Sequence, residues 1–455
     1  MEVHSIGSGG VGVGNLPDGR VVFLPRTAPG DRVRVELVED RKHWARGEVV
    51  EYLAEGTGRQ TPPCLLYHRC DGCALQHLRY PEQCRWKGRM VGDALRRIGK
   101  RDVDDPPVEA SPLRLHYRNK MTFTLRRSKD GRVVAGLHDR LEKRAILDVG
   151  GECLLPGREI VRGWVALRAG WGPKAHRLPE GKELRLTLRS GTGGEAPNGG
   201  APGRERLGLV VAGGRGDGDP ASLLAAVDGL TSVWREEEPG RVRHVAGEPT
   251  LPVRWLGRRL SLPGGAFLQV NQEGGQALHA RVLEEAGDVN GLRVVEGYAG
   301  LGILGSALAE RGARVVAVEN EPTAVERARE SGPEGPPAGG TSGDGGPGSP
   351  WPGKEGEFRM ERGRLEDELE SLLPADLLLV NPPRIGLHQD IPDLLRRRRV
   401  PRIVYVSCDP ATLARDVRRL GSGYTLESLH SFDLFPQTGH VETVAILSNG
   451  EGVAR

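Results

Sequence analysis

Residues 404–416, VYVSCDPATLARD, place Cys408 at the end of a short apolar strand, directly before an acid and a proline. A thiol in such a place is either a small buried apolar side chain or a nucleophile. The nucleophilic form is the thiolate, which the N–H groups of a helix beginning at a strand-to-helix turn can stabilise. The stretch therefore makes Cys408 a candidate for covalent catalysis, with an inert buried thiol as the alternative.

Three other cysteines, Cys64, Cys70 and Cys73, are spaced C-x5-C-x2-C within PPCLLYHRCDGCALQH. The N-terminus lacks the pattern of a signal peptide, and no apolar stretch approaches the ~20 residues of a membrane span. We therefore expect a cytoplasmic protein with reduced cysteines, in which clustered thiols hold a metal rather than form disulfides. A fourth thiolate would complete the site, and the spacing alone fits zinc and an iron–sulfur cluster equally.

The segment LRVVEGYAGLGILGSALAERG is typical of a strand, a glycine turn and a helix. Gly300 and Gly302 allow the backbone to approach a ligand closely, and Glu319, ending the next strand, offers a carboxylate to ribose hydroxyls. Asn381 begins a stiff Asn-Pro-Pro turn at the end of a later strand, where open α/β sheets bind ligands. With an acid ending the first strand, the turn resembles the adenosylmethionine-binding turn of Rossmann-like methyltransferases.

The elements that must position these residues fall into three parts. Residues 1–56 alternate apolar and polar residues between Gly, Pro and Asp, which predicts an OB-like β-barrel. Residues 57–262 carry the cysteine cluster and mixed strands, which predicts a small α+β central domain. Residues 263–455 alternate apolar strands with amphipathic helices, so we expect an α/β Rossmann-like methyltransferase domain with a mostly parallel sheet. Within it, residues 331–357 are so rich in Gly and Pro that we expect a disordered insertion.

The net charge of the 455 residues is only +3, so the overall charge does not by itself indicate a protein that binds nucleic acid. Basic residues are nevertheless clustered in two runs, at residues 85–101 and at residues 396–399. Each run fits either the solvated face of a helix or a contact with the phosphates of a nucleic acid. The other motifs have to decide between these interpretations.

Taken together, the chain resembles the RNA uracil-5-methyltransferases, which make 5-methyluridine in ribosomal and transfer RNA. The motifs that carry the resemblance are IVYVSCDPATLARDVRRL followed by YTLESLHSFDLFPQTGHVETVAIL, FLQVN at residues 267–271, PPR at residues 382–384 and YRNKMTF at residues 117–123. The N-terminal stretch resembles the TRAM domain, a small RNA-binding barrel, through DGRVVFLP, APGDRVRV and ARGEVVE. The resemblance covers nearly the whole chain apart from the glycine-rich insertions, and it implies RNA as the partner.

This resemblance assigns roles to individual residues. It implies that the Cys408 thiolate adds to uracil C6, so that C5 can attack the methyl group of S-adenosyl-L-methionine, and that Glu442 in GHVET then removes the C5 proton. The alternative for Glu442 is a solvated glutamate at a strand edge. The resemblance also implies that Gln269 contacts adenosylmethionine and that Phe267 lies near the target base, with a simple core role as the alternative for Phe267. The further implied cofactor contacts are Tyr298, Gly300, Gly302, Glu319 and Asn381.

For the cysteine cluster, the resemblance implies a [4Fe–4S] cluster, with zinc as the alternative. Cys153, in GGECLLP, is the remaining candidate for the fourth ligand, because Cys408 is assigned to catalysis and Cys84 falls on an amphipathic helix. The barrel and the cluster together favour 23S ribosomal RNA over tRNA as the substrate, again through the resemblance. Since the target base is stacked inside folded RNA, we expect it to be flipped out.

Several positions depart from the family pattern. Asn381 stands where the family has Asp, Ala299 stands where many relatives have Cys or Ser, Ile303 replaces a polar residue, and Arg364 falls near the expected place of the adenine. These changes lower the expected affinity for the cofactor and leave two other functions open. One is an RNA-binding paralogue with weak or lost methyl transfer. The other is an exocyclic-amine methyltransferase, because Asn-Pro-Pro loops occur in enzymes that methylate amino groups.

Overall fold

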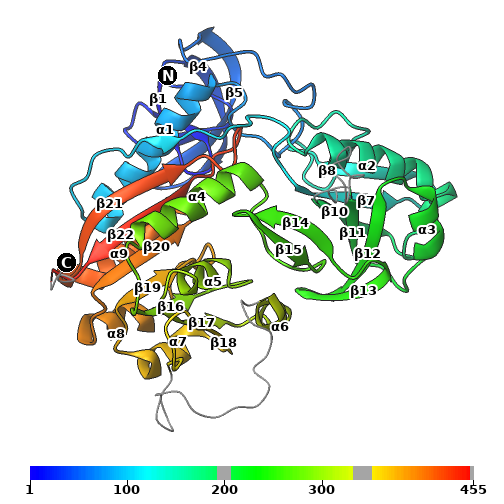
Figure 1. Ribbon diagram of the computed structural model, residues 1–455. Helices are drawn as coiled ribbons and strands as arrows, with labels where there is room; N and C mark the ends of the chain where they lie inside the picture. Colours follow the sequence, from blue (N-terminus) through cyan, green and yellow to red (C-terminus); the bar gives the residue numbers. More distant parts are fainter. Residues whose placement is uncertain (192–205, 332–350, 451–455) are drawn as a thin grey trace. The chain divides into compact units, whose positions relative to one another are not determined.

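The computed structural model describes residues 1–191, 206–331 and 351–450 (Figure 1). The chain forms two compact units. The first comprises Met1–Gln83, Pro112–Glu273 and Pro436–Gly439, and the second comprises Cys84–Ser111, Gly274–Phe435 and His440–Arg455. No helix within the described ranges is long and apolar enough to cross a membrane.

The N-terminal part of the first unit is a five-stranded sheet that curls on itself. Its strands are β1 (Val3–Gly7), β2 (Val11–Asn15), β3 (Val21–Leu24), β4 (Arg32–Asp40) and β5 (Trp44–Ala54), in the order β1-β2-β3-β5-β4. A bridge between Glu2 and Arg32 joins the two ends of the sheet, and buried residues such as Val22 and Leu24 fill its inside. The alternation of apolar and polar residues thus produces the predicted small barrel.

A seven-stranded sheet forms the other core of the first unit. In spatial order its strands are β13 (Arg241–Gly247), β12 (Leu230–Glu238), β11 (Arg206–Ala212), β10 (Glu183–Gly191), β7 (Lys120–Arg127), β8 (Val133–His138) and β9 (Ile146–Asp148). Leu184, Leu186 and Leu188 alternate along β10 and belong to one core with Trp164 of α2 (Arg158–Gly170). The remaining elements are α3 (Pro220–Ala226) and the hairpin of β14 (Leu251–Trp255) and β15 (Arg258–Leu262).

The second unit is built on an eight-stranded sheet. In spatial order its strands are β18 (Phe358–Arg362), β17 (Arg314–Glu319), β16 (Arg293–Gly297), β19 (Leu377–Val380), β20 (Arg402–Ser407), β22 (Glu442–Ser448), β21 (Thr425–Phe432) and β6 (Val108–Glu109). The strands from β18 to β20 run parallel, whereas β22 is antiparallel to both of its neighbours. All four residues of β19 are buried, as expected for a strand covered on both faces. The predicted mostly parallel sheet is therefore confirmed.

Helices precede or connect the strands of this sheet. They are α1 (Tyr80–Ala94), α4 (Gln272–Glu285), α5 (Ile303–Ala309), α6 (Pro322–Ser331), α7 (Leu365–Glu368), α8 (Asp390–Arg397) and α9 (Pro410–Leu420). Residues 84–111 were predicted to lie in the central domain of residues 57–262, but they belong to the second unit. Val91 of α1 and the following Leu95 share a core with Leu413 and Val417 of α9.

The predicted insertion at residues 331–357 is described only at its ends. Ser331 ends α6, and residues 332–350 lie outside the described residues. Trp351 packs against the core of the second unit, with the Arg293 guanidinium 6.0 Å from the centre of its ring. Trp351 therefore belongs to the folded second unit, although the insertion was predicted to extend to residue 357.

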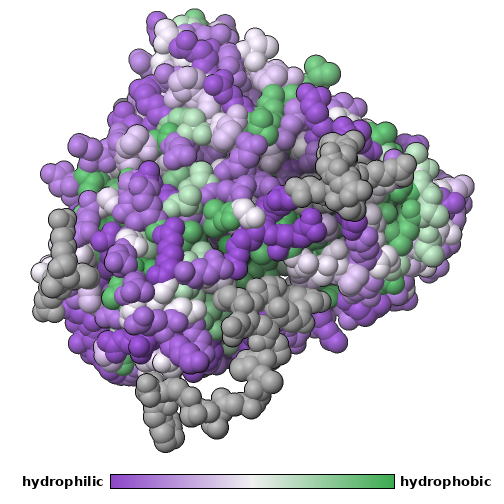
Figure 2. Space-filling model, viewed as in Figure 1, coloured by the Kyte–Doolittle hydropathy of each residue, from purple (hydrophilic) through white to green (hydrophobic). Residues whose placement is uncertain are grey.

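The basic run at residues 85–101 is only partly a surface. Hydrophilic side chains cover much of the face in Figure 2, but Lys87 is fully buried and its ammonium donates to Asp433 Oδ1 at 2.6 Å. Arg96 is paired with two aspartates, and Arg101 donates to the carbonyl oxygens of two residues after α9. An RNA contact is therefore wrong for Lys87, because its charge is compensated inside the fold.

Candidate active site and cysteine pocket

Cys408 and Glu442 lie opposite each other at the end of the second unit's sheet. β20 and β22 are antiparallel, and their last pair joins Ser407 to Thr443. Cys408 follows Ser407 and Glu442 precedes Thr443, so the same register sets the two residues across from each other. The sheet thus brings together the two residues predicted for catalysis.

The surroundings of Glu442 exclude one of the two alternative interpretations, that of a solvated glutamate. Glu442 is only 3% exposed, so it is not a solvated glutamate, and burial raises the pKa of its carboxyl to about 8. Cys408 is half-buried, and burial, followed by the nearby Glu442, raises the pKa of its thiol to about 11. The Arg384 guanidinium opposes both pKa shifts. Arg384 is therefore the cation that favours the thiolate and the carboxylate.

The start of α9 fixes the backbone next to Cys408. Asp409 caps the helix, because its Oδ1 accepts hydrogen bonds from the N–H groups of Ala411 and Thr412, both at 2.9 Å. Pro410 occupies the first helical position, where its missing N–H costs nothing. The Asp-Pro pair of the motif therefore ends the strand and begins the helix directly after the thiol.

The raised pKa values of the buried acids predict how stability depends on pH. Burial raises the pKa of Glu296, like that of Glu442, from 4.5 to about 8. Between pH 4.5 and about pH 8, both carboxyls therefore keep their protons in the folded protein and lose them in the unfolded chain. This contribution to stability is full below about pH 4.5 and is lost as the pH rises through about 8.

Glu442 contributes part of this decrease in stability at high pH. We expect Glu442→Gln to lack that part, because the amide stays neutral at every pH. Between about pH 6 and about pH 9, the melting temperature of the variant should gain about 3 °C relative to the parent protein. Thermal unfolding followed by circular dichroism without ligands measures the difference at each pH. A difference that stays constant over this range would show that Glu442 keeps an ordinary pKa.

The predicted cofactor turn lies at the end of β16. Glu319 Oε2 accepts a hydrogen bond from the Gly300 N–H at 2.8 Å, and a side chain at Gly300 would meet no atom within 4 Å, so the space beside this turn is open. Gly302 has a φ of +66°, and a Cβ there would lie 2.6 Å from the Phe358 ring. The turn therefore needs glycine at residue 302 and leaves room for a ligand at residue 300.

Two departures from the family pattern, Asn381 and Arg364, and the predicted cofactor contact Tyr298 lie near this turn. Asn381 follows β19, and its N–H donates to the Gly297 carbonyl at 3.4 Å. Tyr298 has a φ of +58°, which is unusual for a residue with a side chain. Arg364 donates to Glu366 through Nε at 2.7 Å, and both charged groups act on the Tyr298 hydroxyl, whose pKa burial raises to about 12. The Arg364 charge is thus already compensated by a neighbour.

Gln269 and Phe267 lie in the first unit. The segment that carries them is held by Asn119 of the YRNKMTF motif, whose N–H donates to the Val270 carbonyl at 2.8 Å and whose Nδ2 donates to the Gln269 carbonyl at 3.1 Å. Phe267 is 63% exposed, so a core role for it is wrong. Its contact with the target base, and that of Gln269 with the cofactor, stay predictions.

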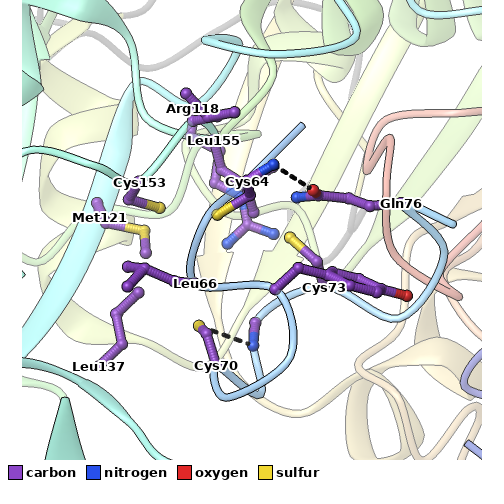
Figure 3. A pocket seen from close by; sticks show the side chains of 13 residues that line it. Cys64, Leu66, Cys70, Cys73, Gln76, Arg118, Met121, Leu137, Cys153 and Leu155 are labelled. Atoms are coloured by element: carbon purple, nitrogen blue, oxygen red, sulfur yellow. Dashed lines mark hydrogen bonds between the residues drawn. The ribbon is translucent and has the colours of Figure 1, made fainter. Parts of the chain in front are cut away.

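The four cysteines predicted as metal ligands line one pocket of the first unit. Figure 3 shows the side chains of Cys64, Cys70, Cys73 and Cys153 around a common space. Burial raises the pKa of Cys73 to about 12 and that of Cys153 to about 11, and it also raises the pKa of Cys70. The neighbouring sulfurs add to each of these shifts. In the described ranges, no three Cys, His, Asp or Glu side chains form a group that could hold a single metal ion.

Two further charged residues had no predicted role. Arg189 of β10 pairs with Lys120 of β7 in the register of the sheet. Arg189 is 5% exposed, and none of its guanidinium nitrogens has a hydrogen-bond partner in the described structure. Burial lowers the pKa of Arg189 to about 10, and burial together with Arg189 lowers that of Lys120 to about 8. Only the sheet register, which the sequence does not reveal, sets the two cations side by side.

Known proteins and two family models are similar in sequence to this chain. Residues 357–450 match the family model of the tRNA (uracil-5-)-methyltransferases, and residues 2–50 match the TRAM domain. An uncharacterized RNA methyltransferase of Nitratidesulfovibrio vulgaris is 32% identical, over 95% of this chain and 92% of its own length. One of Gloeobacter violaceus is 30% identical, over 98% of this chain and 95% of its own length.

A solved structure agrees with the fold. The crystal structure of Pyrococcus abyssi tRNA (uracil-54, C5)-methyltransferase in complex with S-adenosyl-L-homocysteine aligns with a TM-score of 0.70 and 24% identity, covering 98% of this chain and 99% of that one. The family model and the sequence relatives define an adenosylmethionine-dependent enzyme that methylates RNA. The chain belongs to the RNA uracil-5-methyltransferase family and carries an N-terminal TRAM domain.

Proposed function

We propose that this enzyme methylates C5 of a uridine in 23S ribosomal RNA through a covalent bond between Cys408 Sγ and uracil C6. The observation that carries the proposal is the pairing of Cys408 with the buried Glu442 across β20 and β22. C5 of uracil becomes nucleophilic only after a group adds to C6, which requires such a thiol. Methylation of an amino group, the alternative that Asn381 raised, requires neither residue.

Cys408 and Glu442 carry out the steps before and after methyl transfer. The Cys408 thiolate bonds to C6, and the electron pair of the C5–C6 double bond moves into an enolate at O4. Adenosylmethionine, when bound, supplies an electrophilic methyl group, so C5 bonds to it while the sulfonium carbon–sulfur bond breaks. The Glu442 carboxylate takes the C5 proton, the double bond re-forms, and Cys408 leaves as the thiolate. Each turnover thus releases 5-methyluridine, adenosylhomocysteine and one proton.

We propose that adenosylmethionine binds beside the open face of the Gly300 turn. The backbone there and the Glu319 carboxylate, which already accepts the Gly300 N–H, support this assignment. The other proposed contacts are Tyr298, Gly302, Asn381 and, from the first unit, Gln269.

The choice of 23S ribosomal RNA over tRNA rests on the combination of the barrel with the cysteine pocket. The TRAM domain supports RNA binding. Because its substrate RNA is cytoplasmic, we infer that the enzyme works in the cytoplasm. Nucleoside mass spectrometry after incubation with 23S and tRNA transcripts tests the proposal. The expected product is 5-methyluridine in 23S RNA; a methylated amine would contradict the chemistry, and product in tRNA alone would contradict the substrate.

We further propose that Cys64, Cys70, Cys73 and Cys153 hold a [4Fe–4S] cluster. Four thiols around one pocket match the donor set of such a cluster. Their raised pKa values mean that buried thiolates here need a cationic centre to form. A bound cluster would tie the segment of residues 64–73 to Cys153.

The metal content of cysteine variants tests this assignment. Protein purified without oxygen is expected to contain about four irons per chain with broad visible absorbance. Cys153→Ser should lose the absorbance and most of the iron, because one ligand of the cluster is gone. Cys84→Ser, on α1 and outside the pocket, is the matched control and should keep both. About one zinc per chain, or equal iron in the two variants, would rule out the cluster at this pocket.

A further inference from the structure

The Pro-Pro-Arg motif of the second unit ends in a tight turn with two exposed residues at its tip. The Gly386 N–H donates to the Pro383 carbonyl at 2.8 Å, which closes the turn. Arg384 and Ile385 occupy the two central positions, and both are exposed. Ile385 is 72% exposed, which is unusual for a branched apolar side chain at a fixed place.

The turn is held rigidly to the helix that follows Cys408. Arg415 of α9 donates through Nη2 to the Ile385 carbonyl at 2.6 Å. The fully buried carboxylate of Asp416 accepts the Leu387 N–H at 2.8 Å and the Tyr405 hydroxyl at 2.9 Å. Gly386 has a φ of +79°, and a Cβ there would lie 2.4 Å from the side chain of Asp416. The backbone therefore has little freedom to turn Ile385 inward.

The tip stands at the rim of the catalytic pair. Arg384 acts electrostatically on both Cys408 and Glu442. Its Nη2 also lies 3.4 Å from Nε2 of His440, two residues before Glu442. Ile385 is the next residue of this turn, whose Arg384 reaches toward the catalytic pair.

Exposure of this kind is rare on the described part of the second unit. Its only large apolar side chains classed as exposed are Ile385 and Ile98, which is 38% exposed. A single exposed aliphatic residue is ordinary on a protein surface. Ile385 differs because its turn is rigid and carries Arg384, which acts on the nucleophile. An apolar side chain held in this way is suited to contact the bases next to the target uridine.

We propose that Ile385 is a wedge that enters the RNA stack at the position vacated by the target uridine. This inference rests on the proposed attack of Cys408 on uracil C6. Turning a base out of its stack costs free energy, because stacking contacts with both neighbours are lost. An apolar side chain inserted between base steps replaces part of those contacts, as in proteins that kink nucleic acids. Ile385 then favours the flipped state without touching the reacting atoms, so it is a positioning residue.

The test compares two synthetic RNA hairpins around the uridine that the enzyme methylates in RNA transcripts. One hairpin has ordinary neighbours, and the other has an abasic residue on each side of the uridine. Ile385→Ala should lower kcat/KM about 10- to 100-fold on the first hairpin and leave the second nearly unchanged, because no stacking is left to replace. Ile385→Leu should restore most of the activity. Leu141→Ala, which truncates a side chain that is 63% exposed in the first unit, is the matched control and should change neither.

The possible outcomes separate this inference from the proposed function. No 5-methyluridine from the parent enzyme on either hairpin would contradict the proposed function. Normal parent activity with an Ile385→Ala loss that is equal on both hairpins, or absent, would overturn the wedge alone. Fluorescence of 2-aminopurine placed next to the uridine gives a second readout: it should rise when the parent enzyme binds and rise less with Ile385→Ala, and equal rises would overturn the wedge.

Discussion

Replacing Cys408 with alanine is expected to stop the formation of 5-methyluridine, with kcat reduced about 10⁴-fold or more. Uracil C5 is a poor nucleophile until a group has added to C6, and no other cysteine within the described ranges lies next to Glu442 in the sheet. The alanine side chain leaves the backbone bonds of the Asp409 cap in place, so the fold should be kept. Incorporation of a labelled methyl group into RNA transcripts measures the loss.

Two controls show whether the loss is specific to the Cys408 thiol and to the covalent step. Cys84→Ala, which removes a thiol from α1, should keep full activity. Cys408→Ala itself should bind RNA and adenosylmethionine as the parent does, because the thiol contributes to the covalent step rather than to binding. Activity above about one hundredth of the parent value would mean that the thiol is not the nucleophile.

Glu442→Gln is expected to transfer a methyl group once and then remain attached to its RNA. The amide has nearly the shape of the carboxyl but cannot take the C5 proton, so the bond from Cys408 to C6 should persist. Turnover should fall about 10²- to 10⁴-fold, while a covalent protein–RNA complex accumulates. Denaturing electrophoresis with labelled RNA detects the complex, and its mass should include the transferred methyl group.

Glu427→Gln provides the matched control for this variant. Glu427 lies on β21, next to β22, and is exposed, so its amide should turn over normally and form no lasting complex. If Glu442→Gln released methylated RNA at the parent rate, another base would have to remove the proton. If it formed neither product nor complex, Glu442 would act before methyl transfer.

Much of the second unit could be predicted because its signals are local. Strands buried on both faces appear as continuous apolar runs such as LLLV and RIVYVS. The Gly300 turn and the Cys408 motif both follow such strands, so their place at one edge of the sheet follows from the parallel order. The small barrel was predictable for a similar reason, since alternation within each strand marks its inner face.

The pairings between distant segments could not be read from the sequence. Lys87 appeared as part of a basic surface, and only the fold sets it against Asp433. The segment of residues 84–111 joined the second unit because its apolar residues match a core built mostly from residues after 290. The same holds for Arg189 and Lys120, whose contact depends on the register of β10 and β7.

The sequence motifs also did not reveal which of their side chains are exposed to solvent. FLQVN has the composition of a core strand, yet Phe267 lies at the surface while Gln269 is 6% exposed. The segment is not a regular strand, because hydrogen bonds from Asn119 hold it instead. The exposed tip at Ile385 likewise depends on hydrogen bonds from α9 rather than on its own residues.

The central claim is that Cys408 bonds to C6 of the target uridine, and RNA transcribed with 5-fluorouridine tests it most directly. After methyl transfer, fluorine replaces the proton that Glu442 would remove, so the adduct cannot break down. The account predicts a denaturation-stable complex whose digest carries a methylated fluorouridine on Cys408, and no such complex with Cys408→Ala. Full methylation of ordinary RNA without any adduct on the fluorinated RNA would contradict it.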